Sequence, residues 1–216
     1  MTIDELLGLD PVIPVTVIDD PADSVAIARA LVDGGVHTIE VTLRTPAALA
    51  AIERIVSEVP EILVGAGTVI SQAQLRDVAA AGAQFAVSPG STPYLLDALA
   101  ASGLPFLAGC ATPSEIMALL ERGITAAKLF PAAAVGGVAA ARALAGPFPD
   151  MRLCPTGGVD MARAAEYLRL PNVACVGASW ITRGPHRTDE DRDRVKTLAR
   201  AACALRRPQQ ADVVAI

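Results

Sequence analysis

Residues 37–68 read HTIEVTLRTPAALAAIERIVSEVPEILVGAGT, and this stretch is the clearest indication of the fold. A short run rich in Ile and Val at 37–43 is a strand candidate, and the Ala-rich segment 46–58 that follows has helical composition. A second strand candidate lies at 61–66. Two strands joined through a helix lie parallel in one sheet, because the helix carries the chain back across a face of that sheet. The stretch therefore predicts a parallel sheet with helices on its outside.

The same alternation continues along the chain in both directions. Further strand candidates lie at 12–18, 83–88, 104–109, 126–130, 151–155 and 173–178. Further helix candidates lie near 21–33, 71–81, 92–101, 113–122, 136–145, 160–168 and 189–206. Eight strand–helix units in about 200 residues predict an α/β protein with the (β/α)8 TIM barrel fold in a single domain.

We expect the barrel to span residues 1–206 and a C-terminal tail to follow at 207–216. A doubly wound open sheet is the alternative, but the first strand leads into VIPVTVIDDPAD and not into a GxGxxG loop. Several helix starts are marked by a threonine, whose hydroxyl caps the helix, before a proline at the first helical position. These pairs are Thr45-Pro46, Thr92-Pro93 and Thr112-Pro113.

The composition argues against several classes of function. The 216 residues include 18 basic and 23 acidic side chains, a net charge of −5, with four Phe, two Tyr and one Trp. Nucleic-acid binding needs a surplus of cations or aromatic stacking platforms, and this chain offers neither. It has no uninterrupted run of about 20 apolar residues, and its N-terminus, MTIDELLGLD, carries acids where a signal peptide carries positive charge. We expect a cytoplasmic protein with no nucleic-acid or membrane partner.

Cysteine usage gives no sign of a metal site. The chain holds two histidines and four widely spaced cysteines without a CxxC pair, so a Cys/His zinc site has little support. Ordinary buried thiols are the expected state of the cysteines. They are Cys110, Cys154, Cys175 and Cys203.

The strand candidate 37–43 indicates where the chemistry lies, because the active site of such a barrel is at the carboxyl ends of its strands. Alternate residues share a face, and Ile39, Val41 and Leu43 form an apolar face that belongs against the helices. The other face directs Glu40, Thr42 and Arg44 into the barrel mouth. Buried charges are costly unless they are paired or solvated. We interpret Glu40 as an acid/base beside Arg44 as an anion clamp; a structural Glu–Arg pair is the alternative.

Lysine is rare in this chain, which holds only Lys128 and Lys196. Lys196 belongs to the charge-rich segment DEDRDRVKTLAR and is typical of a surface cation, whereas Lys128 lies inside the apolar strand candidate AAKLF. Burial disfavours the charged ammonium, and a Schiff-base nucleophile must be neutral to attack a carbonyl. A lysine held by an interior carboxylate is the alternative. Glu40 and Lys128 both belong to even-numbered strands, which share layers of the barrel, so the two side chains can approach one another.

Glycines follow the last two strands. CPTGGVD (154–160) places Gly157 and Gly158 before a helix, and VGASW (176–180) contains the next glycine. Glycine lets backbone N–H groups approach an anion, and these two loops form the common phosphate site of such barrels. Turns also need glycine, so each motif alone is weak evidence, but together they predict a phosphate site.

Six motifs in series carry a resemblance to a known family. They are EVTLRTP (40–46), VGAGTV (64–69), SPG (88–90), KLFPA (128–132), CPTGG (154–158) and VGASW (176–180). Over residues 5–205 the chain resembles bacterial 2-keto-3-deoxy-6-phosphogluconate aldolases, also called 4-hydroxy-2-oxoglutarate aldolases, which are class I aldolases on a (β/α)8 barrel. The resemblance implies a metal-free carbon–carbon lyase of the Entner–Doudoroff pathway, without a cofactor and typically a homotrimer.

The resemblance also implies the reaction and the site residues. The phosphorylated keto acid would be cleaved to pyruvate and glyceraldehyde 3-phosphate, and 4-hydroxy-2-oxoglutarate to pyruvate and glyoxylate. Lys128 matches the Schiff-base lysine, and Glu40 matches the general acid/base. The remaining matches are Arg44 and Thr68 for the pyruvate carboxylate, Pro89 and Phe130 for apolar walls, and Gly157, Gly158 and Ser179 for the phosphate, with Thr156 beside them.

Two departures from the family pattern bear on the substrate. Ala133 stands where the family often has Glu, and Ala178 stands where a second Gly is usual. The methyl group of Ala178 could crowd a phosphate, which affects substrate preference more than reaction type. Two other functions stay open at this point: a sugar-phosphate epimerase or isomerase on the same barrel, and a ligand-binding barrel without catalysis.

Overall fold

The computed structural model describes residues 1–205 and shows the predicted barrel. Eight parallel strands form one sheet in the order β7-β6-β5-β4-β3-β2-β1-β8, and single bridges pair Leu153 with Val173 and Thr156 with Gly177 across the remaining gap. The strands are β1 (Val12–Thr16), β2 (Thr38–Thr42), β3 (Leu63–Gly67), β4 (Phe85–Val87), β5 (Phe106–Cys110), β6 (Ala126–Leu129), β7 (Arg152–Pro155) and β8 (Val176–Ala178). The predicted (β/α)8 fold is therefore confirmed, while the predicted tail 207–216 lies outside the described residues.

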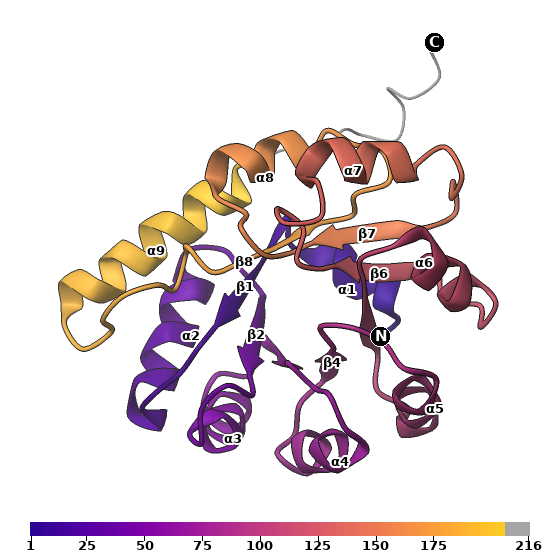
Figure 1. Cartoon of the computed structure of the whole chain (residues 1–216). Helices are drawn as coiled ribbons and strands as arrows, with labels where there is room; N and C mark the ends of the chain where they lie inside the picture. The colour runs from indigo at the N-terminus through magenta and orange to yellow at the C-terminus, as the bar shows by residue number, and fades with distance from the viewer. Residues whose placement is uncertain (206–216) are drawn as a thin grey trace.

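Helices surround the strands, as Figure 1 shows. They are α2 (Ser24–Asp33), α3 (Ala48–Glu58), α4 (Gln72–Ala80), α5 (Pro93–Ser102), α6 (Pro113–Leu120), α7 (Gly137–Leu144), α8 (Met161–Tyr167) and α9 (Asp189–Cys203), with a short 3-10 turn η1 (Pro21–Asp23) before α2. No helix among residues 1–205 is long and apolar enough to cross a membrane.

One further helix, α1 (Ile3–Leu9), was not expected from the sequence. Thr2 caps it in a reciprocal capping box with Glu5, and this Thr-x-x-Glu spacing is the signal that would have revealed it. Its Leu6 and Leu7 are fully buried inside the barrel together with Phe85, so α1 closes one end of the interior with apolar side chains.

Two of the three predicted threonine caps are confirmed. The hydroxyls of Thr92 and Thr112 accept from backbone N–H groups in the first turns of α5 and α6, each followed by proline. The prediction for Thr45 is wrong: α3 begins at Ala48, and the Thr45 hydroxyl instead donates to the carbonyl of Ile18. The hydroxyl is engaged by the neighbouring loop, so it ties two strand-to-helix connections together and is not available as a cap.

The core has two parts, separated by the wall of the barrel. The outer part lies between strands and helices and takes residues such as Ile39 and Val41, as the alternation in β2 predicted. The inner part is apolar where α1 enters and polar beyond it. Cys110, Cys154 and Cys175 are buried, as expected, whereas Cys203 is half-buried.

Candidate active site

Glu40 of β2 and Lys128 of β6 meet inside the barrel. Lys128 Nζ donates to Glu40 Oε1 at 3.0 Å and to Oε2 at 3.4 Å, and the side chains are only 6% and 4% exposed. The register places uncharged residues beside Glu40 on both neighbouring strands, Val15 and Gly65. Each charge therefore depends on the other for compensation, which is the condition for keeping an ion pair in a low-dielectric interior.

Glycines make room for this pair. A Cβ added at Gly67 of β3 would collide with the carboxylate of Glu40, and one added at Gly65 would collide with the ring of Phe85. On β5, a Cβ at Gly109 would collide with the backbone of Pro89. The VGAGTV motif thus has a steric reason: its two glycines allow a carboxylate and an aromatic ring to fill the barrel beside it.

Arg44 does not pair with Glu40, so the alternative of a structural Glu–Arg pair is wrong. It is Lys128 that holds the carboxylate. Arg44 lies beyond the end of β2 and is exposed, and within residues 1–205 no hydrogen bond or ion pair of its guanidinium is found. A free guanidinium at the barrel mouth can bind an anionic group of a ligand.

Thr68, directly after β3, has a left-handed backbone with φ of 63°. This conformation is rare for a β-branched residue, and strain of this kind costs on the order of 1–3 kcal/mol. Thr68 is half-buried and is the only non-glycine residue with positive φ in the described part of the chain. Such strain is concentrated at functional sites, where surrounding structure maintains it.

Apolar side chains flank the lysine. The ring centroid of Phe130 lies 5.5 Å from Lys128 Nζ, within reach of a cation–π contact. Phe130 and Pro89 are both half-buried, and Pro89 follows β4 at the same end of the barrel. Together they can exclude water from a small ligand bound at the lysine.

A cavity of about 510 Å³ opens beside this centre. Its lining includes the predicted phosphate residues together with two predicted keto-acid residues: Thr156, Gly157, Gly158 and Ser179, and Arg44 and Phe130. Gly157 and Gly158 have φ of 95° and 72°, and their added Cβ atoms would meet Phe130 at 3.2 Å and Ala133 at 2.5 Å. The predicted residues Thr68 and Pro89 are not among those that line this cavity.

Thr156 and Ala178 occupy different sides of the barrel wall. Thr156 is buried, with its hydroxyl 3.3 Å from the carbonyl of Cys154, and Gly177 leaves room for that hydroxyl. Ala178 is buried and belongs to the outer core between the strands and the helices. Its methyl group therefore packs away from the interior, although Ala178 also borders the cavity.

Sequence reasoning missed Arg183, which lines the same cavity. Its Nη2 donates to the Ser179 hydroxyl at 3.3 Å. Arg183 also lines a second cavity of about 510 Å³, which reaches toward Asp20 and His186. The sequence signal that could have revealed Arg183 is an arginine in the loop that follows the last predicted strand.

Burial lowers the pKa of His186, and the positive charge of Arg194 acts in the same direction, so the imidazole is neutral at pH 7.

Comparisons with known proteins agree with this geometry. The family model "KDPG and KHG aldolase" matches residues 3–198. A 2-dehydro-3-deoxy-phosphogluconate aldolase of Pseudoalteromonas atlantica is 48% identical, with 93% of each chain covered. A KHG/KDPG aldolase of Escherichia coli K12 is 47% identical over 92% of this chain and 93% of the relative.

Solved structures give the same match in three dimensions. The KDPG aldolase of Legionella pneumophila, with pyruvate captured at low pH as a covalent carbinolamine intermediate, is 44% identical with a TM-score of 0.91, covering 94% of this chain and 99% of that one. The 2-keto-3-deoxy-6-phosphogluconate aldolase of Zymomonas mobilis with 3-phosphoglycerate is 42% identical with a TM-score of 0.91, covering 95% and 97%.

Proposed function

This chain belongs to the KDPG and KHG aldolase family and is a carbon–carbon lyase, and we propose that Lys128 and Glu40 are its catalytic residues. It cleaves 2-keto-3-deoxy-6-phosphogluconate to pyruvate and glyceraldehyde 3-phosphate through a Schiff base. Because the chain belongs to this family, we reject the two other functions, a sugar-phosphate epimerase or isomerase and a ligand-binding barrel without catalysis. The observation that supports the assignment of residues is the buried contact between Lys128 Nζ and Glu40 Oε1.

The first steps form the covalent intermediate. Lys128 must lose a proton before it attacks the C2 ketone, and Glu40 is the hydrogen-bonded group that can accept this proton. Attack gives a carbinolamine. Glu40 then returns the proton to the carbinolamine hydroxyl, which leaves as water, so an iminium that withdraws electrons from C3 forms and Glu40 is a carboxylate again. The neighbours of Glu40 on the adjacent strands, Val15 and Gly65, have no group that could take up or donate a proton.

Cleavage and release follow from the same pair. Glu40, directly or through a water molecule, removes the proton of the C4 hydroxyl, and the C3–C4 bond breaks to release glyceraldehyde 3-phosphate. The electron pair remains on the pyruvate fragment as an enamine. Glu40 then helps to protonate C3, and hydrolysis frees pyruvate and restores the lysine. One carboxyl group thus serves as base and acid in turn.

Binding residues would orient the substrate along the barrel mouth. Arg44 and Thr68 would hold the carboxylate of the keto acid, with a bidentate guanidinium contact that aims the ketone at Lys128. Phe130 and Pro89 would form apolar walls around the keto acid. Thr156, Gly157, Gly158 and Ser179 would receive the phosphate, and all four line the cavity beside Lys128.

Borohydride trapping tests the assignment of the nucleophile. Reduction in the presence of pyruvate should leave a stable adduct on Lys128, located by peptide mass spectrometry. Lys196 is the internal control, because this second lysine is half-buried on α9, outside the barrel interior, with its Nζ 3.5 Å from Asp33 Oδ2. An adduct on Lys196 alone, or none on folded protein, would contradict the assignment.

We further propose that the enzyme also cleaves 4-hydroxy-2-oxoglutarate, since relatives carry the name KHG/KDPG aldolase. The resemblance supports a homotrimer that works in the cytoplasm, within the Entner–Doudoroff pathway. Light scattering after size-exclusion chromatography would determine the number of subunits. A mass of one chain, 22.2 kDa, would contradict the trimer.

A further inference from the structure

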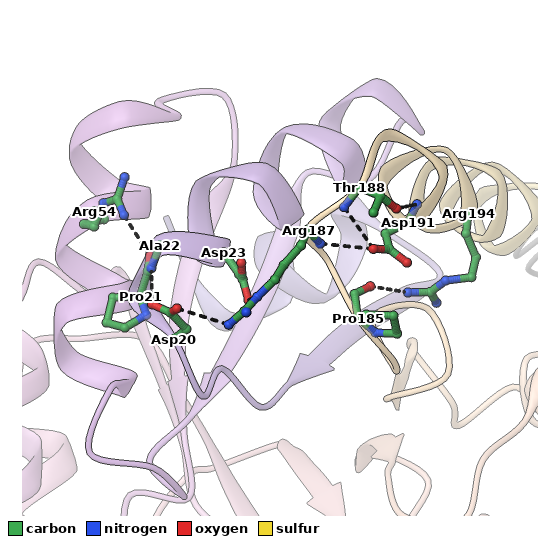
Figure 2. A network of polar contacts seen from close by, with 10 residues as sticks. All are labelled: Asp20, Pro21, Ala22, Asp23, Arg54, Pro185, Arg187, Thr188, Asp191 and Arg194. Atoms are coloured by element: carbon green, nitrogen blue, oxygen red, sulfur yellow. Dashed lines mark hydrogen bonds and ion pairs between the residues drawn. The ribbon is translucent and has the colours of Figure 1, made fainter.

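The loop between β8 and α9, residues 179–188, contains arginines in different electrostatic situations. Arg187 is neutralised, because its Nη2 lies 3.4 Å from Asp20 Oδ2 and its Nε lies 3.9 Å from Asp23 Oδ2. Figure 2 shows this side chain reaching from the loop to the two aspartates that precede α2. The charge of Arg187 is therefore offset by two carboxylates of the β1–α2 connection and is not directed toward the cavity that contains Gly157 and Gly158.

Arg183 differs from Arg187 in its partner. Its side-chain contact is a hydrogen bond to the Ser179 hydroxyl at 3.3 Å, and no carboxylate pairs with it within residues 1–205. The guanidinium lies on the lining of the cavity that also contains Gly157 and Gly158. An unneutralised cation thus stands beside the glycine loop and the serine that the proposed function gives to the phosphate.

The backbone around Arg183 is held in place. From α9, Arg194 donates to the backbone carbonyl of Arg183. It also donates to the carbonyl of Pro185 at 2.9 Å, as Figure 2 shows. Asp191 Oδ2 accepts from the backbone N–H of Arg187 at 3.1 Å and of Thr188 at 3.0 Å. Because the loop is already fixed, the Arg183 guanidinium can bind a ligand with little further loss of conformational entropy in the loop.

From these contacts we propose that Arg183 binds the terminal phosphate of the substrate and makes the enzyme prefer phosphorylated keto acids; this rests on the proposed function. A guanidinium matches a phosphate in both charge and geometry, because it can donate two parallel hydrogen bonds. The phosphate of the six-carbon substrate is attached at the end of the chain. The second carboxylate of 4-hydroxy-2-oxoglutarate is attached directly to the reacting C4, so it stays near Lys128. Arg183 therefore distinguishes the substrates by the position of their second anionic group.

The test compares two charge-removing variants of one loop. Arg183→Gln should lower kcat/KM for 2-keto-3-deoxy-6-phosphogluconate by about 10- to 100-fold, mainly through KM, as expected for a lost hydrogen bond to a charged group. Its kcat/KM for 4-hydroxy-2-oxoglutarate should stay at the wild-type value. Arg187→Gln is the matched control and should change neither. Arg183→Lys, which keeps the charge without the planar donors, should recover part of the lost activity.

Three results would overturn the proposal. The first is an equal loss of kcat/KM on both substrates in Arg183→Gln, and the second is no loss on either substrate. The third is a loss confined to the phosphorylated substrate in Arg187→Gln as well. Pyruvate trapping on Lys128 separates this question from the proposed function, because pyruvate has no phosphate and should be trapped equally by wild type and Arg183→Gln. If wild type fails to trap pyruvate, the aldolase assignment fails. Even then, titration with inorganic phosphate still tests the role of Arg183, because Arg183→Gln should bind inorganic phosphate more weakly than the wild type does.

Discussion

Gly67 of β3 lies so close to Glu40 of β2 that a Cβ added to the glycine would collide with Oε1 of the carboxylate. Gly67→Ala should therefore displace Glu40 from Lys128. We expect a loss of about 1–3 kcal/mol in the free energy of unfolding, as for other overpacked cores, and at least about a 10-fold lower kcat. Gly146→Ala is the control, because nothing lies within 4 Å of its added Cβ. Equal kcat in both variants would show that the position of Glu40 does not depend on Gly67.

Glu40→Gln separates binding from proton transfer. The amide keeps an oxygen that can accept from Lys128 but cannot act as a base. Turnover should fall by about 10²- to 10⁴-fold, the usual contribution of general acid–base catalysis. Pyruvate binding, followed by fluorescence or by protection against heat, should persist. Glu53→Gln makes the same chemical change on the exposed face of α3 and should leave turnover intact. Full turnover in Glu40→Gln would refute the assigned role.

Replacing Thr68 should make the protein more stable and its substrate binding weaker. Asn tolerates the left-handed conformation better than a β-branched residue, so Thr68→Asn should raise the free energy of unfolding by about 1 kcal/mol. The same change removes a proposed ligand of the keto-acid carboxylate, so KM should rise. Denaturant unfolding and steady-state kinetics measure the two effects. Thr125→Asn, at an exposed position without positive φ, is the control. Higher stability with unchanged KM would remove Thr68 from the binding site.

Glu115 makes the α6 cap sensitive to pH. Burial alone would raise the pKa of Glu115, but hydrogen bonds from the N–H of Ala111 and from the hydroxyl and N–H of Thr112 outweigh it and bring the pKa below its ordinary 4.5. A lowered pKa in the folded state means that the ionised carboxylate stabilises the fold. That stabilisation is complete above pH 4.5 and is lost as the pH falls through the lower folded value.

Glu115→Gln should therefore cost about 0.3–1 kcal/mol at neutral pH, the usual contribution of an anion at a helix N-terminus. The difference between the variant and the wild type should shrink toward zero in acid. Denaturant unfolding at a series of pH values measures it. Glu121→Gln, at the opposite end of α6, should have the opposite sign at neutral pH, because an anion at a helix C-terminus is unfavourable. A pH-independent difference for Glu115→Gln would contradict this account.

Local patterns in the sequence predicted much of the site. The alternation in 37–43 placed Glu40 on the inner face, and the isolation of Lys128 in an apolar strand marked it as unusual. Both lie inside the barrel as expected. These predictions succeeded because the face of a strand residue depends only on its neighbours in the chain.

Other features depended on contacts between distant segments. The same sequence pattern allowed Glu40 to pair with Arg44, four residues away, or with Lys128, which lies 88 residues away. The prediction that Thr45 caps a helix was wrong, because its hydroxyl donates a hydrogen bond to the carbonyl of Ile18 in another loop. Neither outcome could be read from sequence spacing.

The residue pattern alone predicted the number of strand–helix units, the inward face of the strand that carries Glu40 and the glycines that follow the last two strands. Period-2 and helical patterns are local, so they can be read without knowing the fold. The folded chain was needed to show that Lys128 and not Arg44 compensates Glu40, and that Arg183 lines the cavity of Gly157 and Gly158. Closure of the barrel sets which side chains meet across its interior, and hydrogen bonds from α9 set where the last loop lies.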